Sequence, residues 1–212
     1  MALDGIMVSA IKDDLNKIIM GGRIDKIYQP DNNIVTMLIR NNDHNYNFLM
    51  SIHPQFCRAQ ITEEKFINPI KAPDFCMILR KYLTRGIIKK ISQPDFERII
   101  EIDILLHNKT YTLFVEIMGR YSNVILVNEE GIILHSLKRI TKTISRERQL
   151  YPGIKYNYPP KQNKLNPLLL SEMDFFKKMD SDFNNSAYKA IMYNFRGIGP
   201  YSAREIVYRA NI

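Results

Sequence analysis

One ten-residue pattern occurs twice in this 212-residue chain, and it constrains the fold more than any other feature. The run 22–31 aligns with the run 86–95, and seven of the ten positions are identical. Each copy follows a helix-like run and precedes an alternating apolar run, which predicts a strand, a Gln-Pro-Asp turn and a second strand. Proline pre-sets the backbone of such a turn, and aspartate can bond to its own backbone. The repeat therefore predicts two similar hairpins with approximate internal symmetry.

The two copies differ directly after the turn. The first continues through Asn32 and Asn33 into its second strand, whereas the second continues through Phe96, Glu97 and Arg98 and is one residue longer. An acid and an arginine thus stand at the mouth of the second hairpin. In one interpretation they form an exposed ion pair, which would stabilise little. In the other, Arg98 grips a phosphate or stacks on a base while Glu97 orients it. The residues alone favour the ion pair.

The hydrophobic pattern of the first 137 residues predicts an α+β fold. Apolar residues at helical spacing predict a helix over 5–20, capped by Asp4 and ended by the two glycines after it. A second helix is predicted from about Asp74 to Thr84, capped by Asp74. Period-two alternation elsewhere predicts about eight strands with short turns. This combination indicates an antiparallel β-sandwich or barrel with two flanking helices.

A glycine interrupts the predicted strand that ends near residue 118. Arg120, Ser122 and Asn123 then place several hydrogen-bond donors together on one turn. A turn with local capping is the favoured interpretation. The alternative is a loop that contacts phosphate through these three side chains.

The amino-acid composition of the chain changes after residue 137. Lys138 and Arg139 begin a basic connector with few apolar residues, punctuated by prolines. It is either a solvated linker or a segment that contacts phosphate. We therefore place a β-sandwich domain at 1–170 and a small helical domain at 171–212.

The predicted helical domain has short helices over 171–179 and 186–195. The sequence Gly-Ile-Gly-Pro comes next, and it is typical of the hairpin in a helix-hairpin-helix element. Gly197 and Gly199 would allow a tight turn and expose amides at a helix N-terminus, where a phosphate can bind. An ordinary connection capped by Gly and Pro is the other interpretation. Because the last helix has run for only about two turns at Ile212, we expect the domain to be part of a longer one.

Charge and composition narrow the function classes. The chain has 30 Lys and Arg against 22 Asp and Glu, a net charge of +8, which favours an anionic partner, with nucleic acid ahead of a membrane. Its two cysteines and four histidines show no metal-ligand spacing. Walker, Rossmann and nucleophile-elbow motifs are absent, so we expect no metal, no cofactor and no enzyme activity. Without a signal peptide or an apolar run of membrane length, a cytoplasmic location is expected.

Several segments, in order along nearly the whole chain, resemble the N-terminal domain of the NFACT family. The resemblance implies a β-sandwich like that of the DNA glycosylase MutM, followed by a helical domain with a helix-hairpin-helix-like element, in a chain that continues further. The segments that carry it are Asp4-Gly5, Gly21–Pro30, Phe75–Tyr82, Glu116–Asn123 and Pro152–Tyr156 with Pro159-Pro160.

The resemblance also implies a function in ribosome-associated quality control. Members of the family bind the large ribosomal subunit carrying a stalled peptidyl-tRNA and recruit charged tRNA, alanyl-tRNA in bacteria, for untemplated addition of C-terminal residues. The Asp-Arg pair needed for tRNA recruitment falls on Glu97 and Arg98, with glutamate in place of aspartate, and the family's N-terminal aspartate falls on Asp4. These three are the predicted tRNA-binding residues.

Two other functions are implied by the resemblance as alternatives. An older name of the family implies a cell-surface adhesin that binds fibronectin, against which the missing signal peptide counts. The likeness to a glycosylase implies base excision, but that chemistry uses an N-terminal proline amine and an adjacent glutamate. Ala2 and Leu3 occupy those positions here, and a four-cysteine zinc finger has no counterpart. A binding module is therefore predicted rather than an enzyme.

Overall fold

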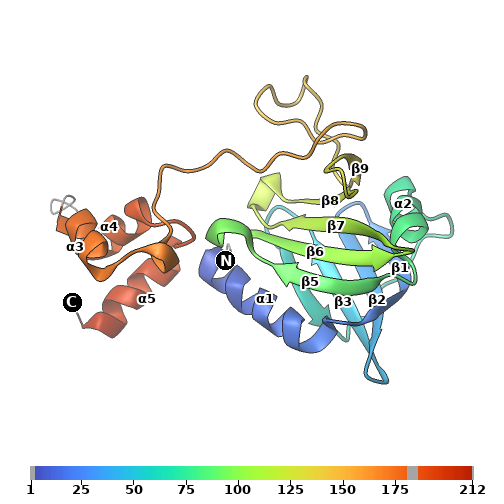
Figure 1. Ribbon diagram of the computed structural model, residues 1–212, viewed down its shortest axis with the longest axis horizontal. Helices are drawn as coiled ribbons and strands as arrows, with labels where there is room; N and C mark the ends of the chain where they lie inside the picture. Colours follow the sequence, from blue (N-terminus) through green and yellow to red (C-terminus); the bar gives the residue numbers. More distant parts are fainter. Residues whose placement is uncertain (1–2, 181–185, 212) are drawn as a thin grey trace.

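The computed structural model of the chain describes residues 3–180 and 186–211, and within them nine strands form one antiparallel sheet (Figure 1). The strands are β1 (Arg23–Asp31), β2 (Ile34–Asn41), β3 (His44–Ser51), β4 (Arg58–Thr62), β5 (Ile87–Ser92), β6 (Ile99–Leu106), β7 (Lys109–Glu116), β8 (Asn123–Val127) and β9 (Ile133–Ser136). The helices are α1 (Gly5–Ile19), α2 (Asp74–Leu83), α3 (Glu172–Asp180), α4 (Ala187–Asn194) and α5 (Pro200–Ala210), with short 3₁₀ helices η1 (Pro94–Phe96), η2 (Gly119–Tyr121) and η3 (Pro167–Leu169).

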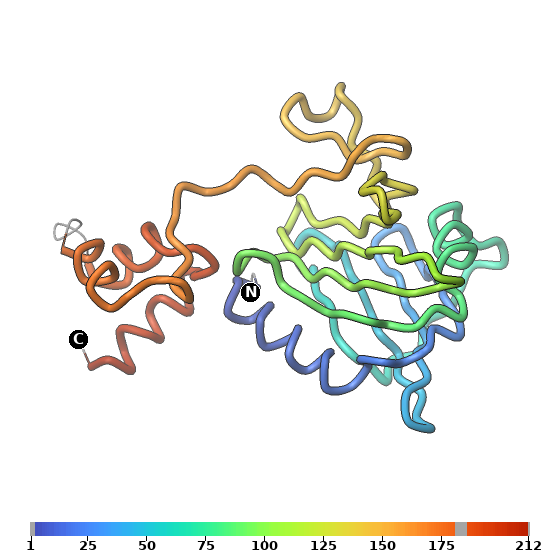
Figure 2. The backbone as a smooth tube through the Cα atoms, in the orientation of Figure 1, coloured from blue at the N-terminus to red at the C-terminus, as the bar shows by residue number. Residues whose placement is uncertain are grey.

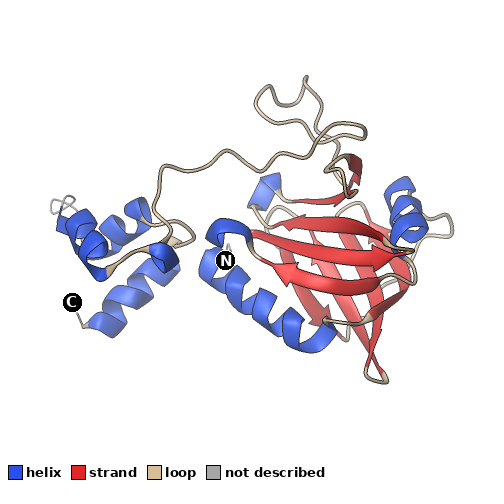
Figure 3. Cartoon of the chain, in the orientation of Figure 1, coloured by secondary structure: helices blue, strands red, loops and turns tan. Residues whose placement is uncertain are grey.

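The sheet folds over along the line between its two halves. Its order is β4-β3-β2-β1-β5-β6-β7-β8-β9, and β1 meets β5 through a single ladder pair, Arg23 with Ile87. Figure 3 shows the strands of the two halves lying one behind the other. The expected α+β class and antiparallel pairing are confirmed. The predicted sandwich differs in one respect: all nine strands within the described residues belong to one continuous sheet.

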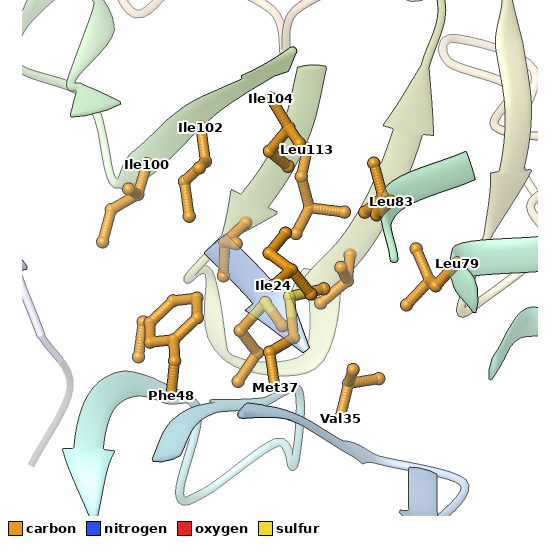
Figure 4. Packing of buried hydrophobic residues seen from close by; sticks show 14 of the residues in the cluster. Ile24, Val35, Met37, Phe48, Leu79, Leu83, Ile100, Ile102, Ile104 and Leu113 are labelled. Atoms are coloured by element: carbon orange, nitrogen blue, oxygen red, sulfur yellow. The ribbon is translucent and has the colours of Figure 1, made fainter. Parts of the chain in front are cut away.

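Both halves of the folded sheet contribute to one core. Ile24 of β1 and Met37 of β2 face Ile102 of β6 and Leu113 of β7, and all four are at most 2% exposed (Figure 4). Burying an aliphatic side chain of this size stabilises the fold by roughly 1.5–3 kcal/mol. Helix α1 packs on the same core through residues at helical spacing: Val8, Leu15 and Ile19. The alternating and helical periodicities of the sequence thus converge on one interior.

The two copies of the repeat adopt different turns. In the first, Pro30 and Asp31 remain inside β1, at an irregularity of the β1–β2 ladder, so the turn predicted there is wrong. Proline lacks an amide to donate and is tolerated at such irregular positions. In the second copy the same residues form η1, where Asp95 and Phe96 have left-handed φ angles of 47° and 59°. The extra residue makes room for this loop.

The second helix begins at the residue that was expected to cap it. Asp74 is the first residue of α2, Pro73 holds the cap position, and no side chain caps the helix. The capping role predicted for Asp74 is therefore wrong. As an acid in the first turn, it still lies at the positive end of the helix dipole.

A long connector and three helices complete the chain. The connector, residues 137–171, leaves β9 and crosses to the helical segment, which consists of α3, α4 and α5. The helical segment lies beside the N-terminal end of α1 (Figure 2). Helices α3 and α4 occupy the predicted ranges, and a small apolar cluster of Ile191, Phe195 and Ala203 holds α4 to α5. The domain boundary near residue 170 and the likeness to the glycosylase fold stay predictions. None of the helices in the described residues is both long and apolar enough to cross a bilayer.

Candidate functional site

Three predicted groups of residues, far apart in the sequence, line one cavity of about 260 Å³. Asp4 precedes α1, Glu97 and Arg98 join η1 to β6, and Gly197 and Gly199 form the turn before α5. The cavity lies where the helical segment meets the mouth of the second hairpin. Its remaining lining residues are Gly5, Gln162, Lys164, Met192, Tyr193, Ile198 and Pro200.

The carboxylate of Asp4 caps two helices at once. Its Oδ1 accepts a hydrogen bond from the Met7 amide at 3.1 Å, which confirms the predicted cap of α1. Its Oδ2 accepts one from the Gly199 amide at 2.9 Å, at the start of α5. A negative charge at helix N-termini is stabilising. The amide of Gly199, one of the two predicted to bind phosphate, is therefore occupied by an anion of the chain itself.

The glycines of this junction permit a close approach of three backbone segments. A Cβ added to Gly197 would lie 2.4 Å from the Cδ1 atom and 2.6 Å from the carbonyl oxygen of Phe96. One added to Gly5 would lie 2.4 Å from the same oxygen. Gly197 also has a φ angle of +73°, in the left-handed region that favours glycine. These residues fasten the helical segment to the loop that carries Glu97, a structural role rather than a phosphate contact.

Glu97 and Arg98 do not pair with each other. Instead, Oε1 of Glu97 lies 3.4 Å from Nε of Arg196, whose guanidinium also forms an ion pair with Asp95. Arg98 donates no hydrogen bond to any described residue and forms no ion pair with one. The ion-pair interpretation of the Glu97–Arg98 dipeptide is therefore wrong. The guanidinium of Arg98 stays free for a ligand that enters the cavity.

Arg196 is a site residue that sequence reasoning missed. Its side chain is only 10% exposed, and Nη2 donates to the carbonyl oxygen of Lys164 at 3.1 Å. A buried arginine needs acidic partners, and Asp95 at the end of the repeat and Glu97 directly after it supply them. The only sequence signal was its position directly before Gly197.

Burial shifts the pKa values of two titratable groups of the cavity, Glu97 and Lys164, in opposite directions. It raises the pKa of Glu97, against the nearby positive charges of Arg98 and Lys164. It lowers the pKa of Lys164, whose charge is favoured by Glu97 and opposed by Arg98. Arg196 is shared between Asp95 and Glu97, so the cations of the cavity without an ion pair among the described residues are Arg98 and Lys164. These two groups can attract an anionic ligand.

Replacing Glu97 by glutamine tests the raised pKa of this carboxyl group. An acid whose pKa rises on folding destabilises the folded state once it ionises, so the penalty is absent below its ordinary pKa of 4.5 and complete only above its raised pKa. We expect the free energy of unfolding of the wild type, minus that of Glu97→Gln, to fall as the pH rises from 4 to 7. Urea unfolding at each pH measures it. A difference that rises with pH would mean that the ion pair with Arg196 lowers the pKa instead.

The turn at residues 119–123 is held together by its own side chains. Ser122 and Asn123 are fully buried. The Ser122 hydroxyl accepts from the Met118 amide at 2.8 Å, and the Asn123 side chain bonds to both backbone groups of Lys138 at 2.9 Å. Arg120 is exposed and lies over the ring of Tyr121, 4.7 Å from its centroid. The structure thus gives Ser122 and Asn123 a capping role and leaves these two buried side chains no surface for a phosphate contact. The contact predicted for Arg120 stays a prediction.

The start of the connector is also engaged within the chain. The ammonium of Lys138 lies 3.4 Å from the carbonyl oxygen of Ile52, and burial lowers its pKa. Arg139 is exposed, with Nη2 2.9 Å from Nε2 of His135. Neither residue lines the cavity, and neither does Arg120. The phosphate contacts predicted for Arg120, Lys138 and Arg139 would therefore lie outside the cavity.

A buried cluster that sequence reasoning missed anchors the connector to the sheet. Glu116, 1% exposed at the end of β7, accepts two hydrogen bonds from Arg148 and one from the Tyr156 hydroxyl at 2.8 Å. The ring of Tyr156 stacks on Phe114 with centroids 3.9 Å apart. Burial, together with the charge of Glu116, raises the pKa of Tyr156, so its hydroxyl stays protonated and donates. The basic connector is therefore held against the sheet at Arg148 rather than solvated there.

Among the described residues, no group of three His, Cys, Asp or Glu side chains is placed to hold a metal ion. Fold and site together define an α+β domain in which a cavity lined by acidic and basic side chains lies between a folded antiparallel sheet and a docked helical segment.

The chain belongs to the NFACT family, since the family model described as NFACT N-terminal and middle domains matches residues 4–212. It is 38% identical to the Rqc2 homolog RqcH of Bacillus subtilis over all of this chain and 38% of that protein. A more distant relative is the human ribosome quality control complex subunit NEMF, 24% identical over 63% of this chain and 12% of its own length. The chain thus spans well under half the length of these relatives.

A solved structure shares the fold. The N-terminal part of the fibronectin/fibrinogen-binding protein from Streptococcus suis superposes with a TM-score of 0.92 at 33% identity, over 100% of this chain and 80% of that one. The observed architecture is therefore that of an NFACT N-terminal region.

Proposed function

We propose that this chain is the N-terminal part of a ribosome quality control factor that binds the stalled large ribosomal subunit and recruits tRNA. The observation that carries the proposal is the free guanidinium of Arg98, in a cavity that Lys164 also lines, at the position of the family's tRNA-recruiting pair. The names of the relatives from Bacillus subtilis and human support the same process. In the proposed process, alanyl-tRNA is recruited for untemplated tailing of the stalled chain.

The physical basis of the proposed activity is binding, without a catalytic group from this chain. A net charge of +8 attracts RNA phosphates, so affinity should fall steeply with salt. Arg98 can bond to phosphate in a bidentate manner or stack on an unpaired base. Glu97 keeps the charge of the family's aspartate and is held by Arg196. Such a factor works in the cytoplasm, on the ribosome.

Replacing Arg98 by alanine tests the proposal. A charge-assisted contact contributes roughly 1.5–3 kcal/mol, so tRNA recovered with the intact tagged protein should fall about tenfold or more. The matched control is Arg40→Ala, because Arg40 is an exposed arginine outside the cavity that pairs only with Asp43 among the described residues. Sequencing the recovered tRNA identifies the species bound. Undiminished recovery of alanyl-tRNA with Arg98→Ala would refute the role of this residue.

The second candidate function is binding of fibronectin or fibrinogen at the cell surface, which is favoured by the name of the Streptococcus suis protein. Cell fractionation separates the two. Protein in the cell-wall fraction and absent from the large ribosomal subunit would favour the adhesin. Co-sedimentation with that subunit supports the first proposal.

A further inference from the structure

The cavity beside Arg98 has a second wall that the repeat and the turn motifs do not predict. Tyr193 and Met192, at the end of α4, form part of this wall, and Lys164 of the connector lines the same cavity and bonds to Met192. Tyr193 is 53% exposed, and its ring stacks on no other described ring. The second wall therefore offers a free aromatic face.

The charged donors still available in the cavity belong to Arg98 and Lys164. Both carboxylates are engaged: Asp4 caps two helices, and Glu97 pairs with Arg196. Lys164 uses one of its three N–H donors, on the carbonyl oxygen of Met192 at 2.9 Å. Arg98 uses none of its donors on the described residues. An anion that enters here meets two cationic donors, while the two carboxylates keep their own hydrogen-bond or ion-pair partners.

We propose that this cavity binds one unpaired nucleotide of an RNA strand, with its phosphate between Arg98 and Lys164 and its base stacked on Tyr193. The inference rests on the proposed function and adds Lys164 and Tyr193 to the residues that contact the ligand. A volume of about 260 Å³ lies below the roughly 300–1,000 Å³ of pockets for drug-sized ligands, so the cavity takes up at most one nucleotide and no duplex. Stacking on an aromatic side chain requires a base that is free of its partner strand.

The test measures binding of labelled RNA to the intact protein by fluorescence anisotropy. The probes are a single-stranded decanucleotide RNA, a blunt RNA duplex of the same length and deacylated tRNA. Tyr193→Ala should weaken binding of the single strand about 5- to 100-fold, the range for loss of one base-stacking aromatic, while Tyr193→Trp should retain it. Lys164→Gln should lower the slope of log affinity against log salt by about 0.7, the value for one phosphate contact on a single strand.

Matched controls come from the same helical segment. Tyr208 is 79% exposed on α5, Lys189 is exposed on α4, and neither lines the cavity. Tyr208→Ala and Lys189→Gln should therefore bind every probe as the wild type does. Adenosine monophosphate, added as a competitor at the concentration of the RNA, should leave the RNA bound.

The outcomes separate this inference from the proposed function. If Arg98→Ala weakens binding while Lys164→Gln and Tyr193→Ala do not, the nucleotide site is refuted and the proposed function stands. If all three variants bind RNA as the wild type does, both the nucleotide site and the proposed role of Arg98 are refuted. Equal affinity for the duplex, or displacement of the RNA by adenosine monophosphate, would overturn the assignment to an unpaired nucleotide of a strand.

Discussion

Glu116→Ala is expected to lower the free energy of unfolding by about 3–5 kcal/mol, because it leaves the buried guanidinium of Arg148 without its acidic partner. The side chains of Glu116 and Arg148 are 0% and 15% exposed, so water cannot replace the lost contact at low cost. Tyr156 would also lose the acceptor of its hydroxyl. Urea unfolding, followed by circular dichroism, measures the change.

Two further variants show whether the charge or the packing of this cluster matters. Glu130→Ala removes an exposed acid from a turn and should leave the unfolding midpoint unchanged. The double variant Glu116→Leu with Arg148→Met removes both charges, and it should recover most of the stability lost in the single variant. A loss of less than about 1 kcal/mol in Glu116→Ala would contradict the buried pair as an anchor of the connector.

Gly197→Ala is the second change with a large expected effect, a loss of about 2–5 kcal/mol. Two costs add: a left-handed backbone conformation on a residue with a Cβ atom, and overpacking against Phe96. Hydrogen exchange at the Gly199 amide, which is bonded to Asp4, should quicken as the helical segment detaches. Urea unfolding measures the overall loss.

The control for this variant separates the two costs. Gly153 has a φ angle of +92°, and a Cβ atom added there would meet nothing within 4 Å. Gly153→Ala therefore carries only the conformational cost, about 1 kcal/mol at the low end of the range for such residues. If Gly197→Ala and Gly153→Ala lost the same stability, the close approach of Gly197 to Phe96 would contribute nothing.

The sequence predicted those elements whose signal is local. Helix α1 and its Asp4 cap are indicated by helical spacings within one segment, and the alternation of apolar residues marks the strands. The prediction failed where two neighbouring residues or segments suited the same structural role. Pro73 and Asp74 both suit a helix start, and the Gln-Pro-Asp sequence suits a turn but stays in β1 because Asn32 and Asn33 turn the chain instead. The same three residues thus adopt different structures in the two copies because the residues after them differ.

The site was predictable as a set of residues but not as a set of contacts. Asp4, Glu97 and Arg98 were identified from the repeat and the resemblance, and they do line one cavity. The partner of Glu97 is Arg196, which lies in another part of the chain. Arg148 and Glu116 are 32 residues apart, and their pairing was likewise not predicted from the sequence. Pairing over such separations depends on how the sheet folds over and where the connector crosses it.

The double cap made by Asp4 also sets an order of assembly during protein synthesis. Asp4 and Gly199 are 195 residues apart, so the N-terminal carboxylate leaves the ribosome long before the amide that completes its bonding. The sheet and α1 can form while the chain is still growing, because their contacts need only residues already made. The second wall of the cavity and then the turn before α5 arrive last. A nascent chain therefore lacks the complete cavity until synthesis has passed the start of α5.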